Sequence, residues 1–234
     1  MWHNKIKEPN ASTRYPALSL VEILIALGLS AFLLMVLVKW QSQFVVSQLY
    51  LRERLQLQQH AQQMVAYMQK HIQYLGFVAK SKQGGNDELF RLNGKAYHLM
   101  PNCLLFFYDV NRDGCIGRAF GKQGFCQQAG VNRADEVVKE FFGFKFQPPH
   151  LLVFARDIKR CRQEACQEWR DYCQQTSYWE NATDLVDYQL DNLQFDWLKP
   201  EQILRIRLRL RSQKYPDIQY ETVAYSKVLN GVEP

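Results

Sequence analysis

The chain has 234 residues, of which 47% are hydrophobic and 22% are charged, and its formal net charge is +6. Beyond an N-terminal segment this length leaves room for one domain of about 150 residues, enough for a hydrophobic core. No internal repeat or low-complexity linker divides it, and the weak positive charge does not by itself indicate a nucleic-acid-binding protein.

A short basic segment, residues 1–17, precedes the first predicted helix. It carries Lys5, Lys7 and Arg14 against the single acidic residue Glu8. Positive charge on one flank of an apolar segment keeps that flank in the cytoplasm. Removing this leader would lower the net charge from +6 to +4.

Residues 18–38 form an almost unbroken apolar run of 21 residues. As a helix this run is about 31 Å long, which matches a hydrocarbon core of about 30 Å. The run is too long for an ordinary secretory signal, and its small residue, Ala17, lies before it instead of after it. Glu22 is the exception inside the run, and an acidic residue at membrane depth indicates a function by default.

Ala17 followed by Leu18-Ser19-Leu20-Val21-Glu22 resembles the class III signal of type IV pilins and type II secretion pseudopilins. That family has Gly where this chain has Ala17, and Phe where it has Leu18. The resemblance implies cleavage between Ala17 and Leu18, methylation of the new amine, and pairing of Glu22 with the amine of a neighbouring subunit. The alternative is a signal-anchor helix with an isolated glutamate.

The helix is expected to continue through residues 39–76 as an amphipathic segment, because no Pro or Gly occurs from Gln41 to Leu75. Gly76 is the expected C-cap. The segment from Ile72 to Phe77 resembles the end of the long helix in minor pilins of the W and J types and in the prepilin peptidase-dependent protein B group. The predicted apolar stripe has helical spacing and consists of Phe44, Leu51, Leu55, Val65, Met68, Ile72 and Leu75.

Residues 77–234 are expected to form a β-rich periplasmic domain. Cys103–Val110 is predicted to be a buried strand, and Asp109, Asn111 and Asp113 follow with the spacing of the first half of a calcium loop. Position 12 of such a loop would be Phe120, where a bidentate glutamate is required. The Asp-Gly pair also indicates a hairpin turn, so a turn without metal is favoured over a calcium site.

Six cysteines beyond an export signal indicate disulfides in an oxidising compartment. Zinc is the alternative for Cys161, Cys166 and Cys173, but their spacing fits no common zinc finger and no histidine lies among them. Each cluster has an odd number of cysteines, so full pairing within the chain requires at least one bridge between clusters; the shortest closes a loop of about 35 residues. The clusters are Cys103, Cys115 and Cys126, and Cys161, Cys166 and Cys173.

The C-terminal part shows the clearest strand pattern. Residues 203–211 alternate apolar and basic side chains, which predicts a half-buried strand, and residues 218–228 are expected to pair with it. The basic side chains could contact phosphate or acidic lipid, but a solvated face that discourages edge pairing is favoured. They are Arg205, Arg207, Arg209 and Arg211.

The expected fold class is α+β, with a long N-terminal helix, half transmembrane and half amphipathic, packed on a mostly antiparallel β-sheet. No catalytic fingerprint occurs and no residue is a candidate for catalysis, so we expect neither an enzyme nor a cofactor.

The resemblance implies a minor pilin or pseudopilin that assembles into, or initiates, a type IV pilus or type II secretion pseudopilus. The expected partners are prepilin peptidase, other major and minor pilin-like subunits and inner-membrane lipid; direct nucleic-acid binding is not expected. The expected location is the bacterial inner membrane, spanned once, with the C-terminal domain in the periplasm, or the tip of a filament. The alternative is a membrane-anchored periplasmic binding protein or enzyme. The residues do not distinguish secretion, surface pili and DNA uptake.

Overall fold

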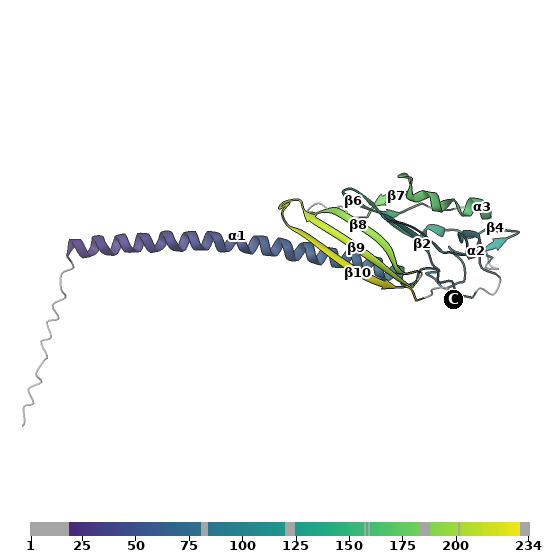
Figure 1. The fold of residues 1–234 in the computed structure, drawn as a ribbon, viewed down its shortest axis with the longest axis horizontal. Helices are drawn as coiled ribbons and strands as arrows, with labels where there is room; N and C mark the ends of the chain where they lie inside the picture. Colours follow the sequence, from purple (N-terminus) through teal and green to yellow (C-terminus); the bar gives the residue numbers. More distant parts are fainter. Residues whose placement is uncertain are drawn as a thin grey trace, which may run out of the picture. The chain divides into compact units, whose positions relative to one another are not determined.

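The computed structural model describes residues 19–80, 84–119, 125–156, 158, 160–182, 188–200 and 202–229 (Figure 1). A long helix is followed by strands and short helical turns, in agreement with the expected α+β class. In chain order the elements are α1 (Leu20–Ile72), α2 (Asp87–Phe90), β1 (Tyr97–Met100), β2 (Cys103–Phe107), β3 (Gln127–Gln128), β4 (Val131–Asn132), η1 (Val137–Lys139), β5 (Phe141–Gln147), β6 (His150–Phe154), α3 (Gln163–Cys166), η2 (Glu168–Cys173), β7 (Trp179–Asn181), β8 (Tyr188–Lys199), β9 (Ile203–Ser212) and β10 (Gln219–Lys227).

Helix α1 is continuous over 53 residues and contains a window that is long and apolar enough to cross a membrane. The chain divides into two compact units, residues 1–51 and 52–234. The second unit therefore contains the last part of α1 together with all the strands.

The last part of α1 is packed against the rest of the second unit. Its buried side chains recur at helical spacing and are Leu57, Ala61, Val65, Met68 and Ile72. The predicted stripe is wrong before this point, because Phe44, Leu51 and Leu55 are 57%, 50% and 56% exposed. Helical spacing in the sequence identifies an apolar stripe but does not say which segments of it have a partner inside the same chain.

The helix ends within one turn of the predicted C-cap. Tyr74 N and Leu75 N donate to carbonyl oxygens three residues earlier, at 3.1 Å each, which tightens the last turn. Gly76 then takes a φ of +77° and donates its N–H to the carbonyl oxygen of Phe107 at 2.9 Å. The end of α1 is thereby tied to the end of β2.

The central sheet is antiparallel and has five strands in the order β1-β2-β5-β6-β7. All five residues of β2 are buried, as expected for a continuous apolar run covered on both faces. Leu104 and Phe106 pack with α1 and the C-terminal strands, whereas Leu105 and Phe107 pack against the segment that contains α2, α3 and η2. The central sheet therefore separates two hydrophobic cores.

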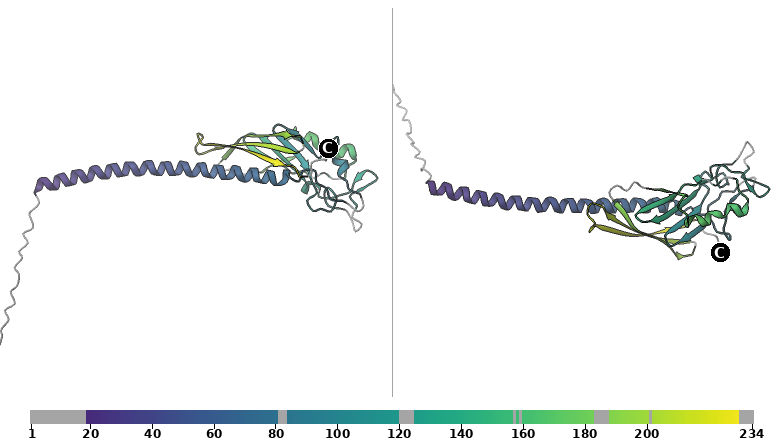
Figure 2. Two further views of the ribbon diagram at one scale, coloured as in Figure 1. Left: turned by 60° about the horizontal axis from the view of Figure 1, so that its bottom comes forward. Right: turned by 90° about the horizontal axis from the view of Figure 1, so that it is seen from above.

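The C-terminal sheet has the antiparallel order β10-β9-β8 and covers the first core together with α1. Strands β9 and β10 confirm the two predicted C-terminal strands to within one residue. Both views in Figure 2 place this sheet beside the last part of α1. Gln69 Nε2 donates to the carbonyl oxygen of Tyr225 and Ser212 Oγ donates to Glu53 Oε1, at 2.9 and 2.7 Å.

All six cysteines are paired, and one bridge joins the two clusters, as parity requires. The crossing bridge is Cys103–Cys173, with a sequence separation of 70, and not the shortest possible one. It fastens η2 to β2, on the face of the central sheet that carries the second core. The other bridges are local: Cys115–Cys126 and Cys161–Cys166.

Candidate functional site

The N-terminal end of α1 is closed by a reciprocal pair of hydrogen bonds. The Glu22 N–H donates to Ser19 Oγ at 3.2 Å, and the Ser19 N–H donates to Glu22 Oε2 at 2.9 Å. This is a capping box, which satisfies two of the free N–H groups at a helix start. The sequence singles out Glu22 for its charge alone, and the structure adds a second role for it in capping α1. The predicted processing residues, Ala17 and Leu18, lie outside the described residues.

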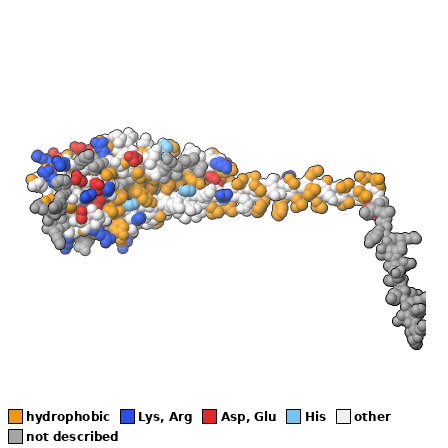
Figure 3. All heavy atoms as spheres, turned by 180° about the vertical axis from the view of Figure 1, so that it is seen from behind, with side chains coloured by type: hydrophobic (Ala, Val, Ile, Leu, Met, Phe, Trp, Pro, Cys, Tyr) orange, Lys and Arg blue, Asp and Glu red, His pale blue; other side chains and the backbone are white. Residues whose placement is uncertain are grey.

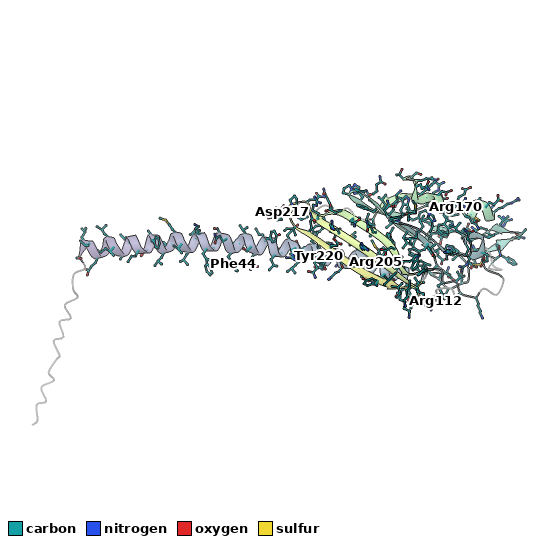
Figure 4. All side chains as sticks on the ribbon, viewed as in Figure 1. Phe44, Arg112, Arg170, Arg205, Asp217 and Tyr220 are labelled. Atoms are coloured by element: carbon teal, nitrogen blue, oxygen red, sulfur yellow. A yellow bond between two sulfur atoms is a disulfide. The ribbon has the colours of Figure 1, made fainter. Side chains whose placement is uncertain are left out.

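The surface of α1 that follows is hydrophobic on all sides. Hydrophobic side chains are visible along the helix in Figure 3, and Phe44 is labelled on it in Figure 4. None of the side chains in the 18-residue apolar window is buried within the chain. Leaving one large aliphatic side chain in water instead of burying it costs about 1.5–3 kcal/mol, so this surface requires lipid or other apolar partners.

This hydrophobic surface extends past the predicted membrane span. Lys39 follows the apolar run, yet the next four turns of α1 carry a second set of exposed hydrophobic side chains. A helix that only anchors a protein needs about 20 apolar residues. The second set is therefore available to contact other proteins, and it comprises Phe44, Val45, Val46, Leu49, Tyr50, Leu51 and Leu55.

The half-calcium motif folds as a turn that is held by its own side chains. Asp109 is buried, and its carboxylate accepts N–H groups from Ala79, Arg112 and Gly114 at 3.1, 2.6 and 2.8 Å. Asn111 Nδ2 donates to Asp113 Oδ2 at 3.1 Å. Among the described residues, no group of three or more His, Cys, Asp and Glu side chains could hold a metal ion. Phe120, the twelfth position, lies outside the described residues.

The expected β-hairpin at the Asp-Gly pair is wrong. Cys115 and Ile116 follow the turn in irregular backbone instead of a strand. The Asn86 side chain makes the hydrogen bonds that a neighbouring strand would otherwise make with Ile116. It accepts the Ile116 N–H at 2.7 Å and donates to the Ile116 carbonyl oxygen at 2.9 Å. The turn is thus fixed by a buried polar side chain from a distant segment.

Glu140 is a second buried carboxylate that holds the turn after β2, and it is not identified from the sequence. Its carboxylate is buried and accepts N–H groups from Val110, Asn111 and Gly117 at 3.0, 3.3 and 2.7 Å. Burial raises the pKa of Glu140 to about 7, although the donors at Gly117 and Asn111 act in the opposite direction. A cavity of about 230 Å³ adjoins it. No local pattern marks this residue, because its partners are 23 to 30 positions earlier in the chain.

His71 is half-buried near the C-terminal end of α1. Its Nδ1 is 2.8 Å from the Tyr108 hydroxyl and its ring stacks on Phe142 at 4.4 Å. Burial, and then the charge of Lys70, lower the pKa of His71. Burial likewise raises the pKa of Tyr108 to about 12. This aromatic cluster joins the end of α1 to β5.

The arginine row of β9 is largely neutralised within its own sheet. Arg205, Arg209 and Arg211 form ion pairs with carboxylates on β8 and β10. The expected solvated face is thus mostly a face of cross-strand ion pairs. Arg207 differs from them, because it forms no ion pair with any of the described carboxylates.

Comparison with known proteins gives two further findings. Residues 50–228 match the family described as "Prepilin peptidase-dependent protein B". The chain is also 31% identical over 185 residues to an uncharacterized protein of Haemophilus influenzae, an alignment that covers 72% of this chain and 77% of that protein. No solved structure matches the chain.

The family match covers most of the chain and includes the packed end of α1, the central sheet, the C-terminal sheet and all six cysteines. The long helix with an exposed apolar surface, followed by an antiparallel α+β domain, is the architecture that the signal-like segment led us to expect. The chain belongs to the prepilin peptidase-dependent protein B family.

Proposed function

We propose that this protein is a minor pilin or pseudopilin subunit that assembles into a filament of the type IV pilus or type II secretion class, or initiates it. In this proposal prepilin peptidase cleaves between Ala17 and Leu18, and the new N-terminal amine is methylated. Residues 18–38 hold the subunit in the inner membrane with its C-terminal domain in the periplasm until it is incorporated. The chain has no catalytic role.

The observation that carries the proposal is the exposed hydrophobic set from Phe44 to Leu55. A membrane anchor for a periplasmic enzyme or binding protein gains nothing from apolar side chains beyond the bilayer. A subunit whose helices pack together gains apolar contact from each of them. Family membership supports the same reading, because the family is named for its dependence on prepilin peptidase.

Glu22 has two separable functions in this proposal. Its side chain caps α1 through Ser19, and its charge pairs with the ammonium group of a neighbouring subunit. A carboxylate and an ammonium are each costly in lipid and attract one another strongly when they pair. A glutamine also serves in a capping box but carries no charge.

The test measures copurification of other pilin-like subunits with three variants of the full chain extracted from membranes. Glu22→Ala removes cap and charge, Glu22→Gln keeps the cap, and Ser19→Ala removes the cap hydroxyl and keeps the charge. We expect Glu22→Ala and Glu22→Gln to reduce copurification by about tenfold or more, as for a lost charge pair worth about 1.4 kcal/mol or more. Ser19→Ala should retain most of it. Wild-type copurification by Glu22→Gln would contradict the pairing role.

A further inference from the structure

The outer face of the C-terminal sheet carries a ladder of cross-strand ion pairs. Side chains of β9 alternate between the core and this face, and the four arginines all lie on the outer side. Arg205 is labelled on β9 in Figure 4. Register places each arginine opposite one residue of β8 and one of β10: Gln189 and Gln219 for Arg211, Asn192 and Glu221 for Arg209, Gln194 and Val223 for Arg207, and Asp196 and Tyr225 for Arg205.

Three of the four arginines have a carboxylate within the sheet. Arg205 Nε lies 3.1 and 3.0 Å from the two carboxylate oxygens of Asp196, directly across on β8. Arg209 pairs with Glu221, directly across on β10. Arg211 reaches Asp191, with Nε and Nη2 at 2.8 and 2.6 Å from Oδ2. A register shift between Leu190 and Asn192 makes Asp191 the extra residue at this point of β8.

Arg207 is the arginine of this row that has no acidic residue opposite it or beside its opposite position on β8 or β10 that pairs with it. Its cross-strand neighbours are Gln194 and Val223, and none of the described carboxylates forms an ion pair with it. Arg205 and Arg209 are its neighbours on the same face, about 6.6 Å away along the strand on either side. Their positive charges, and the engagement of Asp196 and Glu221 with them, keep Arg207 from sharing either carboxylate.

The surroundings of Arg207 are apolar on the β10 side. Val223 is 44% exposed and Tyr225 is 53% exposed, and both lie on the same face as Arg207. An arginine beside exposed aromatic and aliphatic side chains is the composition that protein–protein interfaces favour. A single unpaired guanidinium presents a planar fork that matches one carboxylate.

We propose that this face docks a carboxylate-bearing segment of a neighbouring pilin-like subunit, whose Asp or Glu side chain completes the ladder at Arg207. The inference rests on the proposed function and names the chemistry of the partner surface. A polyanion fits less well, because nucleic acid and acidic membranes are held by several unpaired cations at once. Here three of the four arginines in the row are already neutralised by their own sheet.

The test places a photo-crosslinking amino acid at position 223 of the full chain, in cells that express their own pilin-like subunits. The exposed side chain of Val223 lies directly across from Arg207, and Val110 provides a control position because it is similarly exposed in the distant turn. Cross-linked peptides are identified by mass spectrometry, and the measurement is repeated with Arg207→Gln and Arg207→Lys. Arg207→Gln should leave the melting temperature unchanged, because it breaks no ion pair among the described residues.

We expect position 223 to cross-link to an Asp- or Glu-containing segment of a pilin-like subunit. The yield should fall at least fivefold with Arg207→Gln and less with Arg207→Lys, and position 110 should not give this product. The docking surface is wrong if position 223 gives no product, a lipid or nucleic-acid product, or a pilin product insensitive to Arg207→Gln. An Arg207-dependent product with a protein of another class would overturn the choice of partner. The Glu22 variants report on the proposed function independently of these results.

Discussion

Replacing Glu140 by glutamine should remove a large part of the pH dependence of the domain's stability. Glu140 is 3% exposed and accepts three backbone N–H groups from the turn that follows β2. Burial raises its pKa from 4.5 to about 7, so between these values the folded state binds the proton more tightly than the unfolded state. The free energy of unfolding therefore decreases as pH rises from about 4.5 to about 7 and is level above that.

The size of this effect follows from the two pKa values. The full difference corresponds to about 3 kcal/mol, and somewhat more than about 2 kcal/mol of it falls between pH 4.5 and pH 7, because each state is only half titrated at its own pKa. In Glu140→Gln the amide oxygen still accepts N–H groups on one side, whereas its NH₂ group faces the remaining donors. Loss of that acceptor lowers the variant's stability by about 1–3 kcal/mol. This loss does not itself change with pH, because the amide does not ionise, so the pH dependence that remains in the comparison comes from Glu140 of the wild type.

The assay is urea unfolding of the full chain in detergent, followed by tryptophan fluorescence, which reports on the buried Trp169. The difference in unfolding free energy between wild type and Glu140→Gln should shrink by about 2 kcal/mol between pH 4.5 and pH 7. Asp109→Asn serves as a comparison, because it also removes a buried carboxylate from the same turn. Parallel pH profiles for wild type and Glu140→Gln would refute the argument from burial.

Two further predictions concern the covalent and apolar framework. Replacing Cys103 and Cys173 together by alanine should lower the free energy of unfolding by about 4 kcal/mol, since a bridge across 70 residues removes much unfolded-state entropy. Non-reducing peptide mapping of the wild type should recover this pair. A map with only bridges inside each cluster would contradict the prediction. Met68→Ala should cost about 2–5 kcal/mol in urea unfolding because Met68 is fully buried, whereas Phe44→Ala should leave the domain's stability unchanged. Equal losses from Met68→Ala and Phe44→Ala would mean that α1 packs within the chain along its whole length.

The sequence predicts those elements whose pattern is local. The apolar run and the uninterrupted segment after it predict a long helix, and alternation in residues 203–211 predicts β9. The continuous apolar run of β2 likewise predicts a strand covered on both faces. Each of these signals depends only on residues a few positions apart.

The rest depends on contacts between distant residues. Strand β8 was missed because the extra residue Asp191 shifts its buried positions from Tyr188 and Leu190 to Leu193 and Phe195, which breaks the period of two. The point where α1 becomes buried, at Leu57, is set by where the domain reaches along the helix. Likewise, the sequence shows four equivalent arginines in a row and does not say which acids lie across from them. Only the pairing of β9 with β8 and β10 shows that Arg207, unlike the other three, forms no ion pair with a described carboxylate.

The most direct test of the proposed function is the mass of the intact protein extracted from membranes of cells with active prepilin peptidase. If the chain is a processed pilin-like subunit, the mass should correspond to a chain that begins at Leu18 with one methyl group on its amine. The same cells without the peptidase should give the uncut chain. A chain that still begins at Met1, or that lacks the apolar helix, in the presence of active peptidase would contradict the account.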